Sequence, residues 1–230
     1  MKIIKNIQLK IDEEEVLRYQ GYYNNKLNKA ITKITREEIE RGHHLFEPKG
    51  ISSPIKIKQI SFSSGRVELK NGFSLKFSHS ITNLLKGTGY LVVGVVTIGS
   101  FLENKVSELF SQGEYPRAIA LDAVGTVSVR SLSHYMRSLV CQEAKEQNFQ
   151  ATKYFSPGSA DWDISQQKNI FQMIPVDKIG VKLTESYMMV PQKSLSWIIG
   201  IGKNITITAK DDHSCQICQA TNCQFRKLIN

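Results

Sequence analysis

The spacing of apolar residues predicts helices near the start of the chain. Asp12 is a suitable N-cap, and the three glutamates after it would lie in the first helical turn, where the helix dipole favours negative charge. Leu27, Ile31 and Ile34 recur at helical spacing. A second helix is therefore expected there, stopping near Gly42.

The chain around Gly72 predicts a β-hairpin whose register follows from polarity. A two-residue turn would mix polar and apolar side chains on each face. A three-residue loop instead pairs Leu69 with Phe73. It also pairs Val67 with Leu75, which keeps one face apolar, and it puts the glycine at a left-handed position. We therefore expect the three-residue loop.

From residue 80 onward, strands and helices alternate. The run from Tyr90 to Thr97 is apolar and predicts a buried strand. Ser100 and Glu103 have the spacing of a capping box, which predicts a helix through Phe110. The long helical stretch that follows, from about residue 117 to 147, has apolar positions at Ile119, Ala123, Val124, Val127, Leu132, Met136 and Leu139. A shorter helix bears Ile170, Phe171 and Ile174, and short strands are expected at 181–183, 194–201 and 205–208.

This order of elements predicts a sheet packed by helices, with no internal repeat. We divide the chain into an N-terminal part with helices and a small β unit (1–80), an α+β core (81–210) and a cysteine-rich tail (211–230).

Composition is that of an ordinary globular protein, with 41% hydrophobic and 22% charged residues among 230. The most apolar run is too short to span a bilayer, and the start of the chain lacks a signal core, so we expect a cytoplasmic protein without a membrane partner. The formal charge of +9 permits nucleic acid or an acidic protein as partner. Because the basic residues are scattered, a solvated basic surface is favoured over a nucleic-acid footprint.

The four cysteines point to metal chemistry in the tail. Cys215 and Cys218 have C-x-x-C spacing, and Cys223 supplies a third thiolate. A fourth ligand could come from His213, Cys141 or a group outside the protein. Zinc and an iron–sulfur cluster both fit this set, and an idle reduced tail is the plain alternative. The histidines show no metal spacing, and no phosphate-binding glycine loop or catalytic triad is visible.

Five sets of short segments occur in a fixed order along the chain. They are Leu84–Gly87 with Thr97–Gly99; Asp122–Thr126; Phe155–Gly158 with Asp161, Trp162 and Gln166; Gly180–Ser186 with Met189–Ser194; and Cys215–Cys218 with Cys223 and Arg226. Together they resemble the activation (reactivation) domain of B12-dependent methionine synthase and its free-standing relatives. The likeness covers about residues 80–226, and the first 80 residues only loosely.

The resemblance implies an α+β fold with a curved, mainly antiparallel mixed sheet packed by helices. It also implies a groove that binds S-adenosylmethionine and presents the methyl group to a cobalamin held by another domain or protein. The expected role is that of an accessory protein for cobalamin-dependent methyl transfer, which supports reductive reactivation and remethylation. The implied partners are a corrinoid protein or methionine synthase, with a flavodoxin or ferredoxin as electron carrier.

The resemblance places the binding site at the loop around Pro157 and Gly158. Proline fixes φ and glycine lets a ligand approach the backbone, although a plain Pro-Gly turn is the alternative. No catalytic residue is assigned. The expected binding residues are Lys153, Tyr154, Ser156, Pro157, Gly158, Ser159, Asp161, Glu185 and Ser186.

The chain departs from the family pattern at three positions. Tyr154 stands where the family usually has an arginine, Ser159 where it has a tyrosine, and Arg130 where it often has a glutamate. A tyrosine cannot grip a carboxylate as an arginine does, although Lys153 offers a point charge one position away. These changes favour, as an alternative, a docking or scaffold subunit that does not bind S-adenosylmethionine. An alternative of another class is a basic nucleic-acid-binding protein with a metal knuckle.

Two further positions have candidate roles. Lys193 with the neighbouring Ser194 could contact an acidic partner or phosphate, or could belong to a surface turn. Asp122 is expected to cap or orient the long helix.

Overall fold

One antiparallel sheet organises the protein. The computed structural model describes residues 1–22, 28–159 and 162–205. Its seven-stranded sheet has the order β4-β3-β2-β5-β9-β6, with β1 also paired to β2, and every pair is antiparallel. The strands are β1 (Lys2–Lys5), β2 (Lys49–Ser61), β3 (Arg66–Leu69), β4 (Ser74–Lys76), β5 (Thr88–Thr97), β6 (Gln150–Phe155) and β9 (Ser194–Gly202). The short strands β7 (Lys182–Leu183) and β8 (Met189–Val190) form a separate hairpin.

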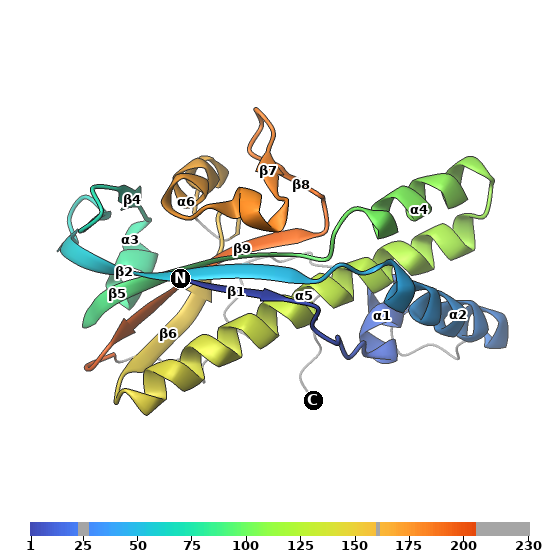
Figure 1. The fold of residues 1–230 in the computed structure, drawn as a ribbon, viewed down its shortest axis with the longest axis horizontal. Helices are drawn as coiled ribbons and strands as arrows, with labels where there is room; N and C mark the ends of the chain where they lie inside the picture. The colour runs from blue at the N-terminus through green and yellow to red at the C-terminus, as the bar shows by residue number, and fades with distance from the viewer. Residues whose placement is uncertain (23–27, 160–161, 206–230) are drawn as a thin grey trace.

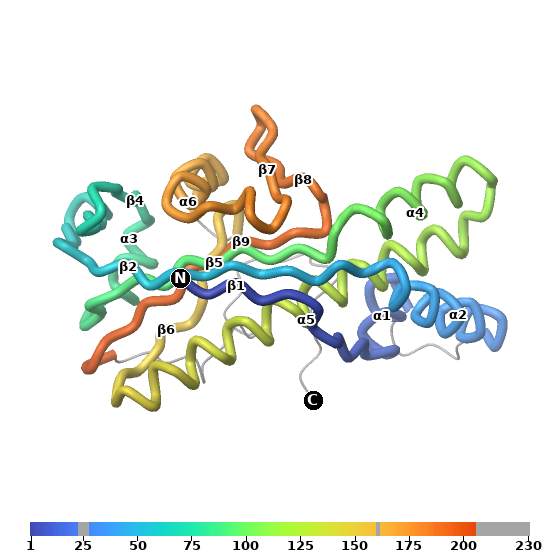
Figure 2. Tube along the Cα trace, in the orientation of Figure 1, coloured from blue at the N-terminus to red at the C-terminus, as the bar shows by residue number. Residues whose placement is uncertain are grey.

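Helices cover both faces of this sheet (Figure 1). The α-helices are α1 (Glu13–Tyr19), α2 (Lys29–Leu45), α3 (His79–Leu84), α4 (Phe101–Ser111), α5 (Tyr115–Glu146) and α6 (Gln167–Met173). Two 3₁₀ turns, η1 (Ile164–Gln166) and η2 (Val176–Ile179), flank α6. The long helix α5 runs across one face and continues beyond the sheet, where α1, α2 and α4 pack against it (Figure 2). The helices α3 and α6 lie on the opposite face.

The central strand β5 supplies side chains to two separate cores. Val92 and Val96 pack toward α5, whereas Leu91, Val93 and Val95 pack toward α3 and α6. A strand buried on both faces carries apolar residues at every position instead of alternating ones. This explains the apolar run that predicted a buried strand here.

Two glycines on the α5 face let large side chains approach the sheet. A Cβ at Gly94 would lie 2.2 Å from the indole of Trp197, which is fully buried on the neighbouring strand. A Cβ at Gly50 would lie 3.0 Å from the sulfur of Met136 on α5. The missing side chains therefore set how closely the helix and the sheet can pack.

An ion-pair network fastens α2 to α5. Arg117 donates to the carboxylate of Glu38 at 2.7 Å and to that of Glu37 at 2.6 Å. Glu38 is fully buried and also lies 3.2 Å from a guanidinium nitrogen of Arg41. The hydrogen bond from Arg117 lowers the pKa of Glu37. A buried carboxylate needs such partners, because an unpaired charge away from water is costly.

The structure confirms the expected α+β class with a mainly antiparallel sheet, and also the hairpin register. Val67 is paired with Leu75, the Leu69 amide donates to the Phe73 carbonyl at 2.9 Å, and Gly72 has φ +89°. No helix in the described ranges is long and apolar enough to cross a membrane.

Three local expectations were wrong. Ser100 has a helical backbone (φ −99°, ψ −13°) and its side chain makes no capping hydrogen bond, while the Glu103 carboxylate accepts from the Gln192 backbone amide at 2.7 Å. Ile119 is 48% exposed although its spacing placed it in the core. The second helix continues past Gly42 to Leu45, since that glycine lies against Val124 of α5.

Strands β1 and β6 were not anticipated. The first is four residues long and depends on pairing with distant β2. In the second, a register shift between Ala151 and Tyr154 interrupts the alternation that would mark a strand. The division of the chain at residue 80 stays a prediction, and β2 of the first part pairs with β5 of the second.

We predict that Gly94→Ala lowers the free energy of unfolding by about 1–3 kcal/mol, because the added methyl group collides with the Trp197 indole. Urea denaturation followed by tryptophan fluorescence measures this change. The matched control is Gly89→Ala in the same strand, where a Cβ meets nothing within 4 Å. That control should change stability by less than about 0.5 kcal/mol. Equal losses in the two variants would refute the packing explanation.

Candidate functional site

The loop that follows β6 is held to the sheet by Trp162. This side chain is 2% exposed, its indole nitrogen donates to the Lys76 carbonyl of β4 at 2.9 Å, and its ring lies 4.7 Å from that of Phe77. The Gln166 side-chain oxygen accepts from the Lys76 amide at 3.1 Å. Trp162 and Gln166, which belong to a segment that resembles the family, therefore anchor the loop to the β3–β4 hairpin.

The expected binding residues Ser156 to Ser159 form a compact turn inside this loop. The Ser159 hydroxyl donates to the Ser156 carbonyl at 2.6 Å, and Pro157 is buried. Gly158 has φ +81°, and its amide donates to the Trp162 carbonyl at 2.8 Å. Gly158 and Ser159 are exposed, so a ligand can reach this part of the backbone. Asp161 lies outside the described residues.

Tyr154 and Lys153 precede this turn on the edge strand β6. Tyr154 packs on the α5 face, and the Arg137 guanidinium of α5 lies 3.7 Å from the centre of its ring. Phe155, the next residue, packs on the opposite face. Lys153 is half-buried. Arg137 thus places a guanidinium on the ring of Tyr154. Sequence reasoning missed Arg137, because it comes from the distant helix α5.

Glu185 and Ser186 lie at the exposed end of the β7–β8 hairpin, which projects from the molecule (Figure 1). The Ser186 hydroxyl lies 3.0 Å from that of Thr184, which also accepts from the Met188 amide. In the described part of the chain, no hydrogen bond joins this hairpin tip to the turn at Pro157.

A second group of polar residues gathers at the ends of β5 and β9. The Lys193 ammonium lies 2.7 Å from the Asp122 carboxylate and donates to the Thr126 hydroxyl at 3.0 Å. Its aliphatic stem lies against Gly125, where a Cβ would be 3.2 Å from Cε. We call Lys193, Asp122 and Thr126 the Lys193 cluster. Lys193 is 14% exposed in its side chain and so is held by α5, not presented to solvent.

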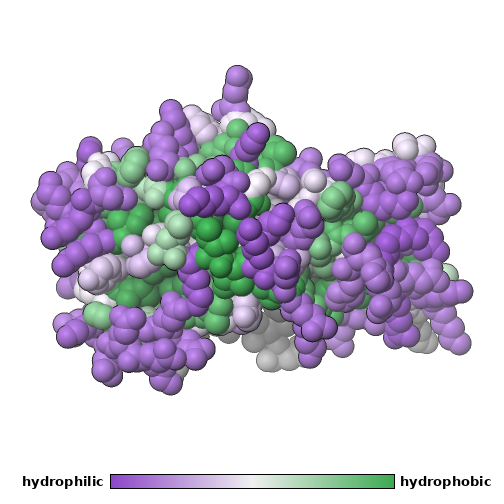
Figure 3. All heavy atoms as spheres, in the orientation of Figure 1, coloured by the Kyte–Doolittle hydropathy of each residue, from purple (hydrophilic) through white to green (hydrophobic). Residues whose placement is uncertain are grey.

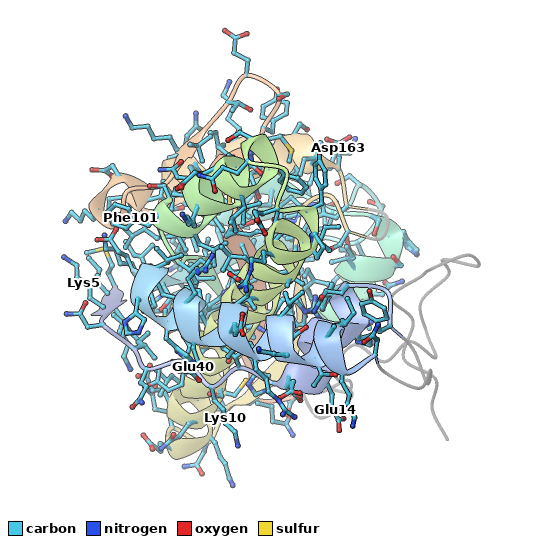
Figure 4. The ribbon with its side chains drawn as sticks, turned by 90° about the vertical axis from the view of Figure 1, so that its right-hand side faces the viewer. Lys5, Lys10, Glu14, Glu40, Phe101 and Asp163 are labelled. Atoms are coloured by element: carbon cyan, nitrogen blue, oxygen red, sulfur yellow. The ribbon has the colours of Figure 1, made fainter. Side chains whose placement is uncertain are left out.

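Neighbouring contacts extend this cluster. The buried Ser194 hydroxyl donates to the Thr97 hydroxyl at 2.9 Å and lies 2.7 Å from the carbonyl of Pro191, which follows a cis peptide bond. The Thr97 hydroxyl also accepts from the Gly99 amide. Three of the segments that resemble the family therefore meet in one place: residues 97–99, 122–126 and 189–194. In Figure 4, the labelled Phe101 and Asp163 lie on opposite sides of the molecule, so the start of α4 is separate from the loop after β6.

Sequence reasoning missed one buried polar contact between the sheet and α6. Gln167 is 3% exposed, and its side-chain oxygen accepts from the Ser196 hydroxyl of β9 at 2.6 Å. Glutamine at the start of a short helix carries no signal for burial. Among the described residues, no group of three or more His, Cys, Asp or Glu could hold a metal ion. Cys215, Cys218 and Cys223 lie outside the described residues.

Comparison with known proteins identifies the family. The family model for the Vitamin B12 dependent methionine synthase, activation domain, matches residues 86–206, which is more than half of the chain. The protein therefore belongs to this family, and the resemblance seen in the sequence is confirmed over these residues. No curated protein matches.

A solved structure shares the fold. It is described as "Crystal Structure of the MetH Reactivation Domain bound to AdoHcy" and matches with a TM-score of 0.59 at 13% sequence identity. The match covers 86% of this chain and 77% of the other. At this identity, the likeness is evidence for the fold alone.

We predict that Lys193→Met lowers the free energy of unfolding by about 1 kcal/mol, because it removes the ion pair with Asp122 and the hydrogen bond to Thr126 but keeps the aliphatic stem. Thermal or urea unfolding measures the loss. Asp122→Asn should add little in the Lys193→Met background, since the two residues act together. Lys182→Met, at an exposed position, is the control and should be neutral. Additive losses would show that the two charges are not coupled.

Proposed function

We propose that this protein is an accessory protein for cobalamin-dependent methyl transfer. It docks on a corrinoid protein or methionine synthase and supports reductive reactivation and remethylation with S-adenosylmethionine. The observation that carries the proposal is membership of the activation-domain family over residues 86–206. The solved reactivation domain with a similar fold is described as bound to AdoHcy, the compound that remains when S-adenosylmethionine has given up its methyl group.

The residues before and in the turn fit the amino-acid end of such a ligand. Its carboxylate needs a cation, and the Arg137 guanidinium and Lys153 are two cationic groups at β6. The exposed backbone at Gly158 can approach a ligand closely. In this role the protein binds and orients the methyl donor, while the partner's cobalamin supplies the cobalt chemistry.

Two observations support the docking or scaffold role without S-adenosylmethionine. Glu185 and Ser186 lie at an exposed hairpin tip, and no described hydrogen bond connects them to the turn at Pro157. Tyr154, in place of an arginine, removes a two-pronged partner for a carboxylate. In this alternative the corrinoid partner is bound and the methyl donor is not.

Calorimetric titration with S-adenosylmethionine and with AdoHcy separates the two roles. We expect saturable heat. We also expect Gly158→Ala to weaken binding at least about tenfold, because a Cβ in the turn strains a φ of +81° and would lie 2.8 Å from the Ile164 side chain of η1. Gly180→Ala is the matched control, with φ +77° and nothing within 4 Å of its Cβ. It should leave ligand affinity unchanged. Absence of heat at millimolar ligand supports the scaffold role, provided that the protein still binds a purified corrinoid protein in gel filtration.

We also propose that Cys215, Cys218 and Cys223 bind a metal, on the basis of their spacing alone. Anaerobic purification followed by elemental analysis and ultraviolet-visible spectroscopy is the test. Stoichiometric iron with absorbance from thiolate-to-iron transitions is the expected result for a cluster that passes electrons. Stoichiometric zinc would indicate a structural site, and Cys218→Ala should release either metal. A metal-free protein would remove the proposal.

A further inference from the structure

A cavity of about 400 Å³ lies between the C-terminal half of α5 and the sheet. None of the residues expected to bind the methyl donor lines it. It opens beside β1, on the α5 face, whereas Phe155 and Trp162 at the expected loop pack on the other face. Figure 3 shows apolar surface exposed across the middle of the molecule in this view, with hydrophilic surface on either side.

The walls of the cavity are mainly apolar. Val92 and Ile201 contribute from the sheet, and Val140 and Ala144 contribute from α5. Tyr90 and Phe149 add two aromatic rings with their centroids 6.4 Å apart and an interplanar angle of 71°. A cavity of this volume with apolar and aromatic walls is typical of a site for a small organic molecule. Rings at this angle also suit an edge-to-face contact with a further aromatic group.

One polar side chain of the sheet faces the cavity. Ser52 of β2 is 4% exposed and lines the cavity, and its hydroxyl has no hydrogen bond within the described part of the chain. The hydroxyl oxygen is accessible from the cavity, so a ligand can form a hydrogen bond with it. The serine thus gives an apolar cavity one fixed polar contact, which orients a ligand.

The charged side chains that line the cavity are paired. Its charged lining residues are Lys2 and Glu143, which form an ion pair with each other across β1 and α5. A charged ligand would lose hydration on binding, and neither Lys2 nor Glu143 is free to compensate for that loss, because they are paired with each other. An uncharged ligand has no such cost. Pro54, also in the lining, has no N–H to offer to an added strand, which argues against an extended peptide as the occupant.

We propose that this cavity is a binding site for a small, uncharged aromatic molecule with one hydrogen-bonding group that meets Ser52. The site is separate from the methyl-donor turn, and the proposal does not depend on the proposed function. Because the cavity lies between α5 and strands β2, β5 and β9, the occupied site would add contacts between the helix and the sheet.

The probe is N-phenyl-1-naphthylamine, an uncharged aromatic amine that fluoresces in apolar surroundings. We expect saturable binding of one molecule per chain, with a dissociation constant on the order of 10 μM. Ala144→Leu should weaken binding at least about tenfold, because the larger side chain fills the cavity from a buried position on α5. Ser52→Ala should weaken binding of the amine about threefold to tenfold through loss of one hydrogen bond. It should leave binding of the hydrocarbon 1-benzylnaphthalene unchanged.

A second variant, at an exposed position, tests the site without changing the buried core. Gln147 lies exposed at the cavity rim and caps the C-terminal end of α5, so Gln147→Trp should block entry without disturbing the core. Gln112→Trp is the matched control, an exposed glutamine that caps α4 and does not line the cavity. Tenfold weaker binding in Gln147→Trp, with full binding in Gln112→Trp, supports the proposal.

Two results would overturn the site. One is the absence of saturable binding by the wild-type protein. The other is unchanged affinity in both Ala144→Leu and Gln147→Trp, which would place the probe on exposed apolar surface elsewhere. If Ser52→Ala weakens the amine and the hydrocarbon equally, the assigned hydrogen bond is wrong. Circular dichroism and the unfolding temperature of each variant show whether it has folded.

Discussion

The pairing of β5 with β2 on one side and β9 on the other is the interaction on which the rest of the structure depends. Both ladders extend over most of the strand, from about Tyr90 to Thr97. Because β5 is buried on both faces, its alternate side chains join two cores that otherwise share few elements. Gly94 makes room for the Trp197 indole under the long helix, and Gly50 makes room for Met136 of that helix. The close packing of α5 on the sheet therefore depends on two positions that have no side chain.

The two faces of the sheet carry different candidate sites. The face toward α6 carries the turn at Pro157, which Trp162 ties to the outer hairpin. The face toward α5 carries the stacked Tyr154 and Arg137, and also the cavity beside Ser52. The strand β6 borders both faces, because Tyr154 and Phe155 point in opposite directions. A ligand near this edge strand would therefore be within reach of groups from either side.

Many residues of the segments that resemble the family make contacts within the protein. Trp162 and Gln166 hold the Lys76 backbone, Ser194 bonds to Thr97, and Lys193 pairs with Asp122. Such contacts maintain the architecture, and the exposed residues Gly158 and Ser159 are the part of the turn that a ligand can reach. This explains how a chain can keep the family's segments and fold while changing individual positions such as Tyr154 and Ser159.

The sequence by itself determined the elements whose cause is local or periodic. The apolar run of β5, the long helix α5 and the three-residue hairpin loop at Gly72 follow from side-chain spacing and from backbone freedom at one glycine. The ordered segments also indicated the family and hence the fold. Only the tertiary structure decided which distant groups meet. It placed Arg137 over Tyr154, joined the Glu103 carboxylate to the Gln192 amide, and left a cavity beside Ser52. The reason is physical: these outcomes depend on how α5 crosses the sheet and on which strand lies next to which. No short-range pattern encodes those distances.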